Sequence, residues 1–189
     1  MKKVLLCAAI AVLTMTTSFA QASFGAKAGV NFANITGDDL DGTEGKIGFH
    51  IGAVAEISFS EKFSFQPELL FSTQGLKAEE GDGKLKLNYI NLPLMGKYYV
   101  MDGLSLELGP QVGFLLSAKS DDGNDDVDVK DSLKSIDFGL NIGVGYKMES
   151  GLNFGVRYNL GLSDINDVDG YDGENKNGVI QVSVGYFFN

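Results

Sequence analysis

His50, the only histidine of the chain, could act as a general base at neutral pH. Ser72 or Ser117 could then serve as a nucleophile, with Glu44 or a loop aspartate orienting the imidazole, as acyl hydrolysis or acyl transfer would require. Such a trio is defined by its geometry, which residue types alone do not supply. A buried histidine that hydrogen-bonds to polar neighbours is therefore the favoured expectation.

Two acidic segments, residues 121–128 and 167–174, offer carboxylate oxygens of the kind that calcium binds. Neither segment has the full spacing of an EF-hand loop, and runs of like charge usually remain solvated. Solvated loops are the expectation, with binding of divalent cations as the alternative. The net charge of −10 disfavours nucleic acid as a partner, because its phosphates would be repelled.

A third set of residues is balanced in sign and lies outside these acidic segments. It consists of Lys27, Glu56, Glu68, Lys97, Glu107, Asp137, Lys147 and Arg157. Charges enclosed together in a protein interior must pair, because an isolated buried charge is costly. If the fold brings these residues together, they form an ion-paired polar network.

The segments that carry this set place apolar side chains at every second position, which is typical of β-strands. Leu85 and Leu87 are out of phase with the segment that follows them, which indicates a bulge or a strand that starts in a loop. Most of the segments approach the nine to eleven residues that a tilted membrane strand needs. There are eight: residues 24–32, 47–57, 63–71, 90–100, 104–116, 136–146, 152–160 and 180–188.

Short and long connections alternate between these segments. Residues 58–62, 101–103 and 149–151 form tight turns, whereas the long loops are residues 34–46, 75–84, 119–132 and 163–177. This alternation is typical of outer-membrane barrels, in which the short turns face the periplasm. The acidic residues gather in the long loops, which we expect to be extracellular.

The face opposite the apolar stripe is rich in glycine and serine, in addition to the eight charged residues. Glycine weakens a strand that faces solvent, but it makes room and allows tight curvature inside a narrow barrel. The pattern therefore favours a polar lumen over a soluble periplasmic barrel or sandwich, which remains an alternative. Eight strands enclose only enough space for side chains, so we expect a plugged lumen and no open pore.

Residues 1–20 have the features of a cleaved signal peptide. Lys2 and Lys3 precede an apolar run over residues 4–15, and a small-x-small site ends at Ala20. Cys7 lies within this signal, so the mature barrel, residues 21–189, would have no cysteine and no disulfide. With one histidine and no cysteine, we expect no metal centre and no cofactor. Export to the outer membrane is the predicted localisation.

Several short motifs, in order along the mature chain, resemble the small outer-membrane β-barrel family typified by PorT, the porin-family proteins common in Bacteroidetes. They are residues 25–31 (GAKAGVN), 65–72 (FQPELLFS), 89–94 (YINLPL), 97–98 (KY), 109–110 (GP), 113–117 (GFLLS), 137–140 (DFGL), 157–158 (RY) and 160–162 (LGL). The resemblance implies an outer-membrane barrel and carries no shared catalytic motif. Phe187-Phe188 resembles the C-terminal signal read by barrel-assembly machinery, although Asn189 follows it.

Together these features predict an all-β protein, an eight-stranded antiparallel up-and-down transmembrane β-barrel with a structural or interaction role and no enzymatic activity. Its expected partners are outer-membrane lipid and, during biogenesis, the barrel-assembly machinery. Because some eight-stranded outer-membrane barrels modify lipid A, a lipid A hydrolase or acyltransferase using His50 is the alternative enzyme reading.

Overall fold

The computed structural model describes residues 22–37, 43–79, 81–121, 123, 125–167 and 173–188, so the predicted signal peptide lies outside the described residues. The described chain is almost entirely β-structure, with one 3-10 turn, η2 (Lys130–Ser132). The strands are β1 (Ala22–Gly37), β2 (Thr43–Ser58), β3 (Phe63–Ala78), β4 (Lys84–Met101), β5 (Leu104–Asp121), β6 (Asp126–Asp128), β7 (Ile136–Lys147), β8 (Leu152–Gly161) and β9 (Asn175–Phe188). Among these residues, no helix is both long and apolar enough to cross a membrane.

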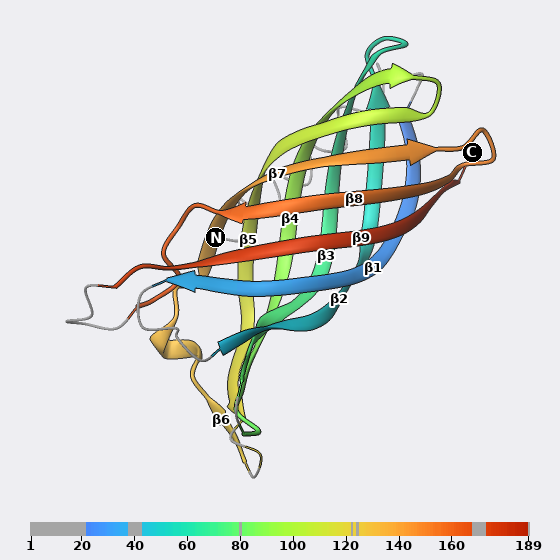
Figure 1. Cartoon of the computed structure of the whole chain (residues 1–189). Helices are drawn as coiled ribbons and strands as arrows, with labels where there is room; N and C mark the ends of the chain where they lie inside the picture. The colour runs from blue at the N-terminus through green and yellow to red at the C-terminus, as the bar shows by residue number, and fades with distance from the viewer. Residues whose placement is uncertain are drawn as a thin grey trace, which may run out of the picture.

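Eight of these strands close into an antiparallel barrel (Figure 1). Each pairs with its neighbours along the chain, and pairing between β1 and β9 joins the two ends of the sheet. Strand β6 pairs only with the end of β5 and lies outside the closed ring. The predicted eight-stranded up-and-down barrel is therefore confirmed.

The strands β1 to β5 extend well past the expected membrane length, with 16 to 18 residues each. The predicted loop boundaries were wrong here, because residues 34–37, 43–46, 75–78 and 119–121 belong to strands. Backbone hydrogen bonding continues along a hairpin whatever the polarity of its side chains, so polar residues continue the ladder beyond the apolar stripe. The acidic loops are correspondingly shorter than expected.

The change of apolar phase near Leu87 does not break β4, whose inward-facing positions continue regularly from Leu87 to Lys97, and the β-bulge at this level lies in β5. The register passes from Asn88 opposite Ser117 to Tyr89 opposite Leu115, which leaves Leu116 as an extra residue in β5. A bulge of this kind lets the strand change its alignment without breaking the sheet. Beyond the bulge Ala118 of β5 faces inward, where it packs with Leu87, Tyr89 and Leu115 near the loop end of the barrel.

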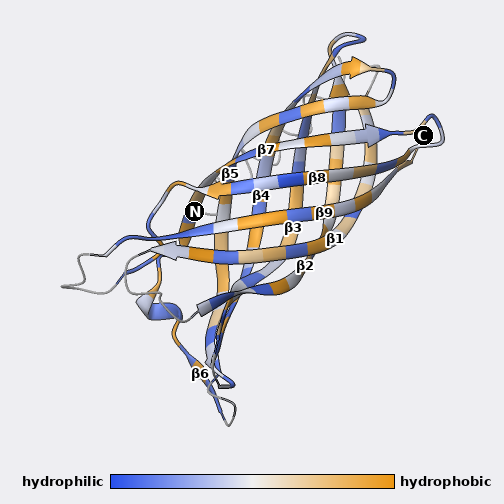
Figure 2. Ribbon diagram, viewed as in Figure 1, coloured by the Kyte–Doolittle hydropathy of each residue, from blue (hydrophilic) through white to orange (hydrophobic). Residues whose placement is uncertain are grey.

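Apolar and polar residues alternate along the strands (Figure 2), and the apolar stripe lies on the outside. Ile142 is 59 % exposed and Val156 is 55 % exposed, whereas buried polar and charged residues outnumber buried hydrophobic ones. This arrangement is the reverse of a soluble barrel with an apolar interior. Close strand packing requires glycine at Gly52, where an added Cβ would lie 1.9 Å from the Leu69 carbonyl oxygen.

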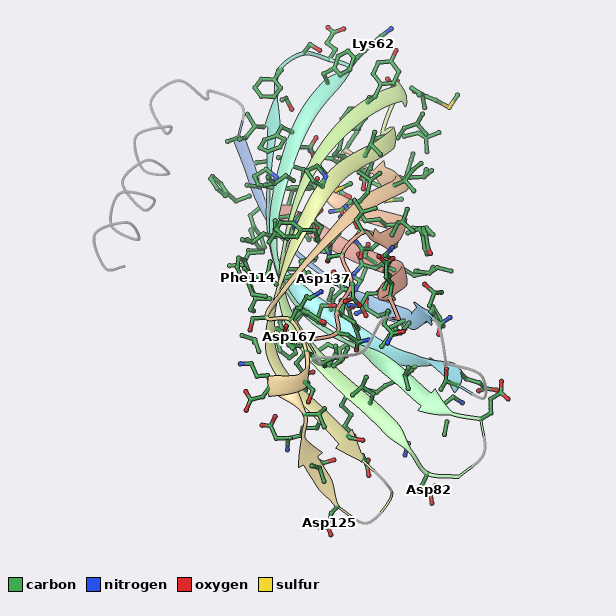
Figure 3. The ribbon with its side chains drawn as sticks, turned by 90° about the vertical axis from the view of Figure 1, so that its left-hand side faces the viewer. Lys62, Asp82, Phe114, Asp125, Asp137 and Asp167 are labelled. Carbon is green, nitrogen blue, oxygen red and sulfur yellow. The ribbon has the colours of Figure 1, made fainter. Side chains whose placement is uncertain are left out.

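The short turns and the long loops occupy opposite ends of the barrel. Lys62, in the turn between β2 and β3, lies at one end, and Asp82 and Asp125 lie at the other (Figure 3). Gly103 and Gly151 adopt positive φ angles of 77° and 88° in the other two short turns, a conformation that glycine adopts without strain. Because short turns face the periplasm in outer-membrane barrels, we call the short-turn end the periplasmic end.

Candidate functional site

Six ion pairs join seven of the eight charged residues, all except Asp137, into one series inside the barrel. Arg157, in the middle of β8, donates from Nη1 and Nη2 to the two carboxylate oxygens of Glu68, at 3.0 and 2.9 Å. Its Nη2 also lies 2.9 Å from a carboxylate oxygen of Glu107. Lys27 reaches Glu68 from β1 at 3.0 Å. Arg157 is thus the bridge between two buried carboxylates.

The series continues toward the periplasmic end through Lys97, the second cation that bridges two carboxylates. Nζ of Lys97 lies 3.6 Å from Glu107 and 3.5 Å from Glu56. Glu56 also pairs with Lys147 at 3.2 Å and accepts a hydrogen bond from the hydroxyl of Tyr99. Each carboxylate of the series therefore has at least two cationic partners.

Closure of the barrel brings these residues together. The seven lie on seven different strands, and every one belongs to the inward-facing set of its strand. Lys97 and Glu107 are register partners on neighbouring strands, but Arg157 is 89 residues away from Glu68 in the chain. The alternation of side-chain direction along each strand places every charge on the inner face. Only closure of the sheet then brings each charge beside its partner. Each ion removed from water costs several kcal/mol, so a buried ion pair is stabilising only while both of its partners are present.

Asp137 lies apart from this series, at the loop end of β7. Its carboxylate accepts hydrogen bonds from Ser163 Oγ at 2.7 Å and from Asn177 Nδ2 at 2.8 Å. No lysine or arginine of the described chain pairs with it. The residue sits near the start of its strand, several residues from the level at which the basic side chains cluster.

His50 belongs to a group of amide and hydroxyl side chains between the ion pairs and the loop end. It is 1 % exposed, and its Nδ1 lies 2.7 Å from Asn31 Oδ1. Asn31 Nδ2 in turn donates to Ser72 Oγ at 3.0 Å. Gly29 provides the space, because a Cβ there would lie 2.6 Å from the imidazole. The histidine is a buried member of a hydrogen-bonded layer.

The structure does not assemble the catalytic trio that the sequence made conceivable. His50 and Ser72 are register partners, but the Ser72 hydroxyl accepts hydrogen bonds from Asn31 and Gln74. Ser117 Oγ accepts a hydrogen bond from Asn88 at 2.8 Å on the neighbouring strand. Glu44 is exposed and pairs with Lys77. Among the described residues, neither serine hydroxyl is hydrogen-bonded to the imidazole.

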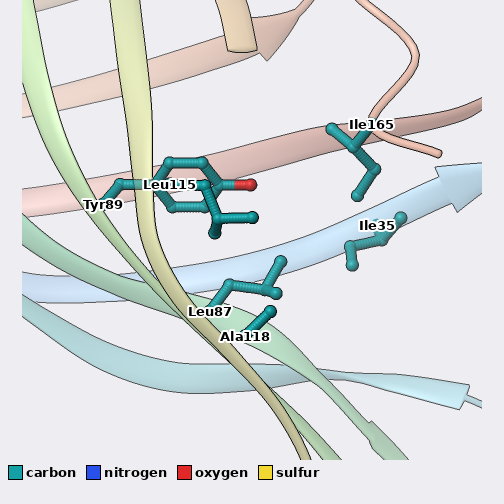
Figure 4. Packing of buried hydrophobic residues seen from close by; sticks show 6 residues of the cluster. All are labelled: Ile35, Leu87, Tyr89, Leu115, Ala118 and Ile165. Atoms are coloured by element: carbon teal, nitrogen blue, oxygen red, sulfur yellow. The ribbon is translucent and has the colours of Figure 1, made fainter. Parts of the chain in front are cut away.

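An apolar cluster closes the loop end of the lumen, and the sequence analysis missed it. Its members point toward one another from β1, β4, β5 and the segment after β8 (Figure 4). They are Ile35, Leu87, Tyr89, Leu115, Ala118 and Ile165. The opposite phase of Leu85 and Leu87 was the available signal, since it turns apolar side chains inward at this level.

Ile165 enters the cluster from a lid formed by the third and fourth loops. Its carbonyl accepts a hydrogen bond from Lys134 N, and its own N–H donates to the Asn175 carbonyl, both at 2.8 Å. Asp167 N donates to the Ser132 carbonyl at 3.0 Å. Backbone hydrogen bonds therefore join the two loops over the barrel mouth, while a buried side chain anchors them from below.

We expect Ile165→Ala to loosen this lid while the barrel stays folded. The substitution removes three carbon atoms from the apolar cluster and should lower the local opening free energy by about 2 kcal/mol, at the lower end for buried truncations. Amide hydrogen exchange at residues 165 and 167 should accelerate correspondingly. Unchanged exchange there would contradict the anchoring role of Ile165.

The lid also contains an ion pair whose effect depends on pH. Burial opposes ionisation of Asp164, but hydrogen bonds from Lys134 and from the backbone N–H groups of Asn175 and Asn166 outweigh it and lower the pKa of Asp164. Because its pKa is lowered on folding, Asp164 stabilises the lid above its ordinary pKa of 3.8 and loses this effect as the pH falls through the lower folded value. Carboxyl NMR titration should give a midpoint below 3.8. In Lys134→Ala the midpoint should rise, and an identical midpoint would contradict the assignment.

The periplasmic end of the lumen is more open. A cavity of about 610 Å³ lies there, with Glu56, Ser64, Tyr99, Lys147 and Glu149 among its lining residues. At the other end, the acidic segments for which cation binding was the alternative to solvated loops fall partly outside the described residues. Within the described part of the chain, no group of three or more histidine, aspartate or glutamate side chains is placed to hold a metal ion.

Comparison with known proteins agrees with this architecture. A family model described as an outer membrane protein beta-barrel domain matches residues 19–167. Neisserial surface protein A has a similar structure, with a TM-score of 0.62 at 17 % identity over 88 % of this chain and 99 % of that one. Ail of Yersinia pestis scores 0.55 at 16 % identity over 88 % and 99 %. A major outer membrane protein of Thermus thermophilus scores 0.51 at 15 % identity over 89 % and 100 %. No curated protein matches the sequence.

Proposed function

Because the chain belongs to the outer membrane protein beta-barrel domain family, we propose that it is a closed barrel of the outer membrane with a structural or interaction role. Its apolar outer face contacts lipid, and its lumen is plugged by polar and charged side chains. Its acidic loops face the exterior. In this proposal the barrel is neither an open pore nor an enzyme.

One observation carries the proposal, namely that Arg157 bridges Glu68 and Glu107 across the centre of the barrel. Eight strands enclose only enough room for side chains, and these residues come from three separate strands. The apolar cluster around Ile165 supports the same conclusion from the loop end. The periplasmic cavity then ends at the ion pairs, so solute entering from that side meets a filled centre.

Reconstitution into planar lipid bilayers tests the proposal. Folding is verified first by heat-modifiable migration on a gel, which is typical of intact outer-membrane barrels. The folded protein should then show no stable open-channel current above the bare bilayer. A large, sustained conductance from the same preparation would contradict a plugged lumen.

We also propose the narrower assignment, a PorT-like barrel of the type common in Bacteroidetes, from the ordered motifs along the chain. Four of them contain residues of the ion-paired series, which are Lys27, Glu68, Lys97 and Arg157 in residues 25–31, 65–72, 97–98 and 157–158. Further proposed partners are the barrel-assembly machinery, through Phe187-Phe188, and divalent cations at the loops. Calcium titration followed by amide NMR tests the last of these, and unchanged resonances over residues 121–128 would contradict it.

A further inference from the structure

A groove on the outer face of the barrel has no counterpart in the sequence analysis. It has a volume of about 700 Å³ and lies over β3, β4, β5 and β7. Phe63 and Tyr98 form one wall, with their ring centroids 4.8 Å apart. Leu108 and Ile142, which lie at the register level of Gly96, also line the groove. Cavities of about 300–1,000 Å³ are typical of small-molecule binding sites.

Gly96 creates the groove. It occupies an outward-facing position of β4, where Leu94 and Tyr98 on either side carry large side chains. An added Cβ at this position would meet only the Leu108 carbonyl oxygen, at 3.4 Å. The backbone therefore has room for a side chain that the sequence does not supply. The gap lies on a surface otherwise covered by exposed apolar groups.

Charged residues of both signs lie in the short turns that join the strands of the groove at the periplasmic rim. Phe59, which lines it, belongs to the same turn as Glu61 and Lys62. A second hollow of about 300 Å³ is lined by Glu61, Lys62 and Asp102 among others. In the part of the chain that the structure describes, none of these three side chains takes part in a salt bridge. A cation and two carboxylates without salt-bridge partners thus lie in the turns that adjoin β3, β4 and β5, the strands under the groove.

Resting on the membrane location and orientation given under the proposed function, we propose that this groove binds one phospholipid of the periplasmic leaflet that carries a phosphoethanolamine headgroup. One acyl chain fills the space over Gly96, between the aromatic wall and Leu108. The phosphate pairs with Lys62, and the ammonium group pairs with Glu61 or Asp102. The arrangement complements a zwitterion, because a headgroup with only negative charge would leave both carboxylates opposed to it.

Native mass spectrometry of the delipidated, refolded protein tests this proposal, with phosphatidylethanolamine or phosphatidylglycerol of identical acyl chains added. The wild type should retain one phosphatidylethanolamine molecule in preference to phosphatidylglycerol. Gly96→Leu fills the groove, and Lys62→Glu removes the phosphate partner, so each should lower this retention by about tenfold. Ala53→Leu is the matched control, since it adds a similar side chain to the outer face of β2, away from the groove.

Each variant is first shown to be folded by heat-modifiable migration. Equal retention of phosphatidylethanolamine by the wild type and Gly96→Leu would overturn the site. Equal retention of the two lipids by the wild type would overturn the headgroup assignment. A protein dimer that Gly96→Leu abolishes would overturn the proposal in favour of a second copy of this chain as the occupant.

Discussion

Arg157→Ala is expected to destabilise the folded barrel by about 3–5 kcal/mol, because it removes the cation shared by two buried carboxylates. Glu68 would keep Lys27, and Glu107 would keep Lys97, but the bidentate contact and the bridge between them would be lost. Urea unfolding in lipid vesicles, followed by the fraction with folded gel migration, measures the change. Arg157→Lys should recover only part of it, since an ammonium group cannot make the paired contacts of a guanidinium.

Lys77→Ala is the control for this measurement. Lys77 pairs with Glu44 on the exposed part of β2 and β3, where the two side chains are 47 % and 53 % exposed. Exposed pairs contribute between 0 and about 1 kcal/mol, so this substitution should change stability little. Equal effects of the two substitutions would contradict a special role for the pairs inside the lumen.

Val156→Arg is expected to lower the stability of the barrel in a bilayer by about 2–4 kcal/mol. Val156 lies midway along β8, next to Val144 and Val182 on the neighbouring strands, and faces outward. An arginine there would place a charge at the middle of the hydrocarbon region. The same vesicle unfolding assay measures the loss.

Met101→Arg gives the depth control for this prediction. Met101 ends β4 beside the short turn, so an arginine there can reach water, and the expected cost is about 0–1 kcal/mol. Equal costs at Val156 and Met101 would show that residue 156 does not lie in the hydrocarbon region. A cost near zero at both positions would contradict the outward orientation of the apolar stripe.

The eight strands were predictable because a closed barrel imposes a strict period of two on each of them. Residues such as Lys97 and Arg157 could be placed on the inner face from this period alone. Their partners could not, because Arg157 meets Glu68 across the barrel interior rather than in the sheet register. Pairing of that kind depends on closure, stagger and side-chain length.

At the loop end of the barrel, the structure differs most from what the sequence predicted. The long hairpins and β6 have the polar composition of loops, and their strand character comes from backbone pairing that composition does not reveal. Ile165 is an apolar residue within an acidic loop, and its burial depends on Leu87, Tyr89 and Leu115, which face it from the barrel wall. The groove could not be predicted from the sequence either, because Gly96 resembles the glycines of the inner face but lies on the outer one.

The central claim is that apolar side chains meet lipid while polar ones fill the barrel, and Tyr98 and Tyr99 test it at one depth. They are consecutive residues of β4. Tyr98 faces outward, and the hydroxyl of Tyr99 donates a hydrogen bond to Glu56 inside the barrel. The chain has no tryptophan, so Tyr98→Trp and Tyr99→Trp each introduce a single tryptophan, whose emission is followed separately from that of the six remaining tyrosines. In vesicles of brominated phospholipid, the fluorescence of Tyr98→Trp should be strongly quenched and that of Tyr99→Trp largely preserved. Equal quenching of both, or stronger quenching at position 99, would contradict the account.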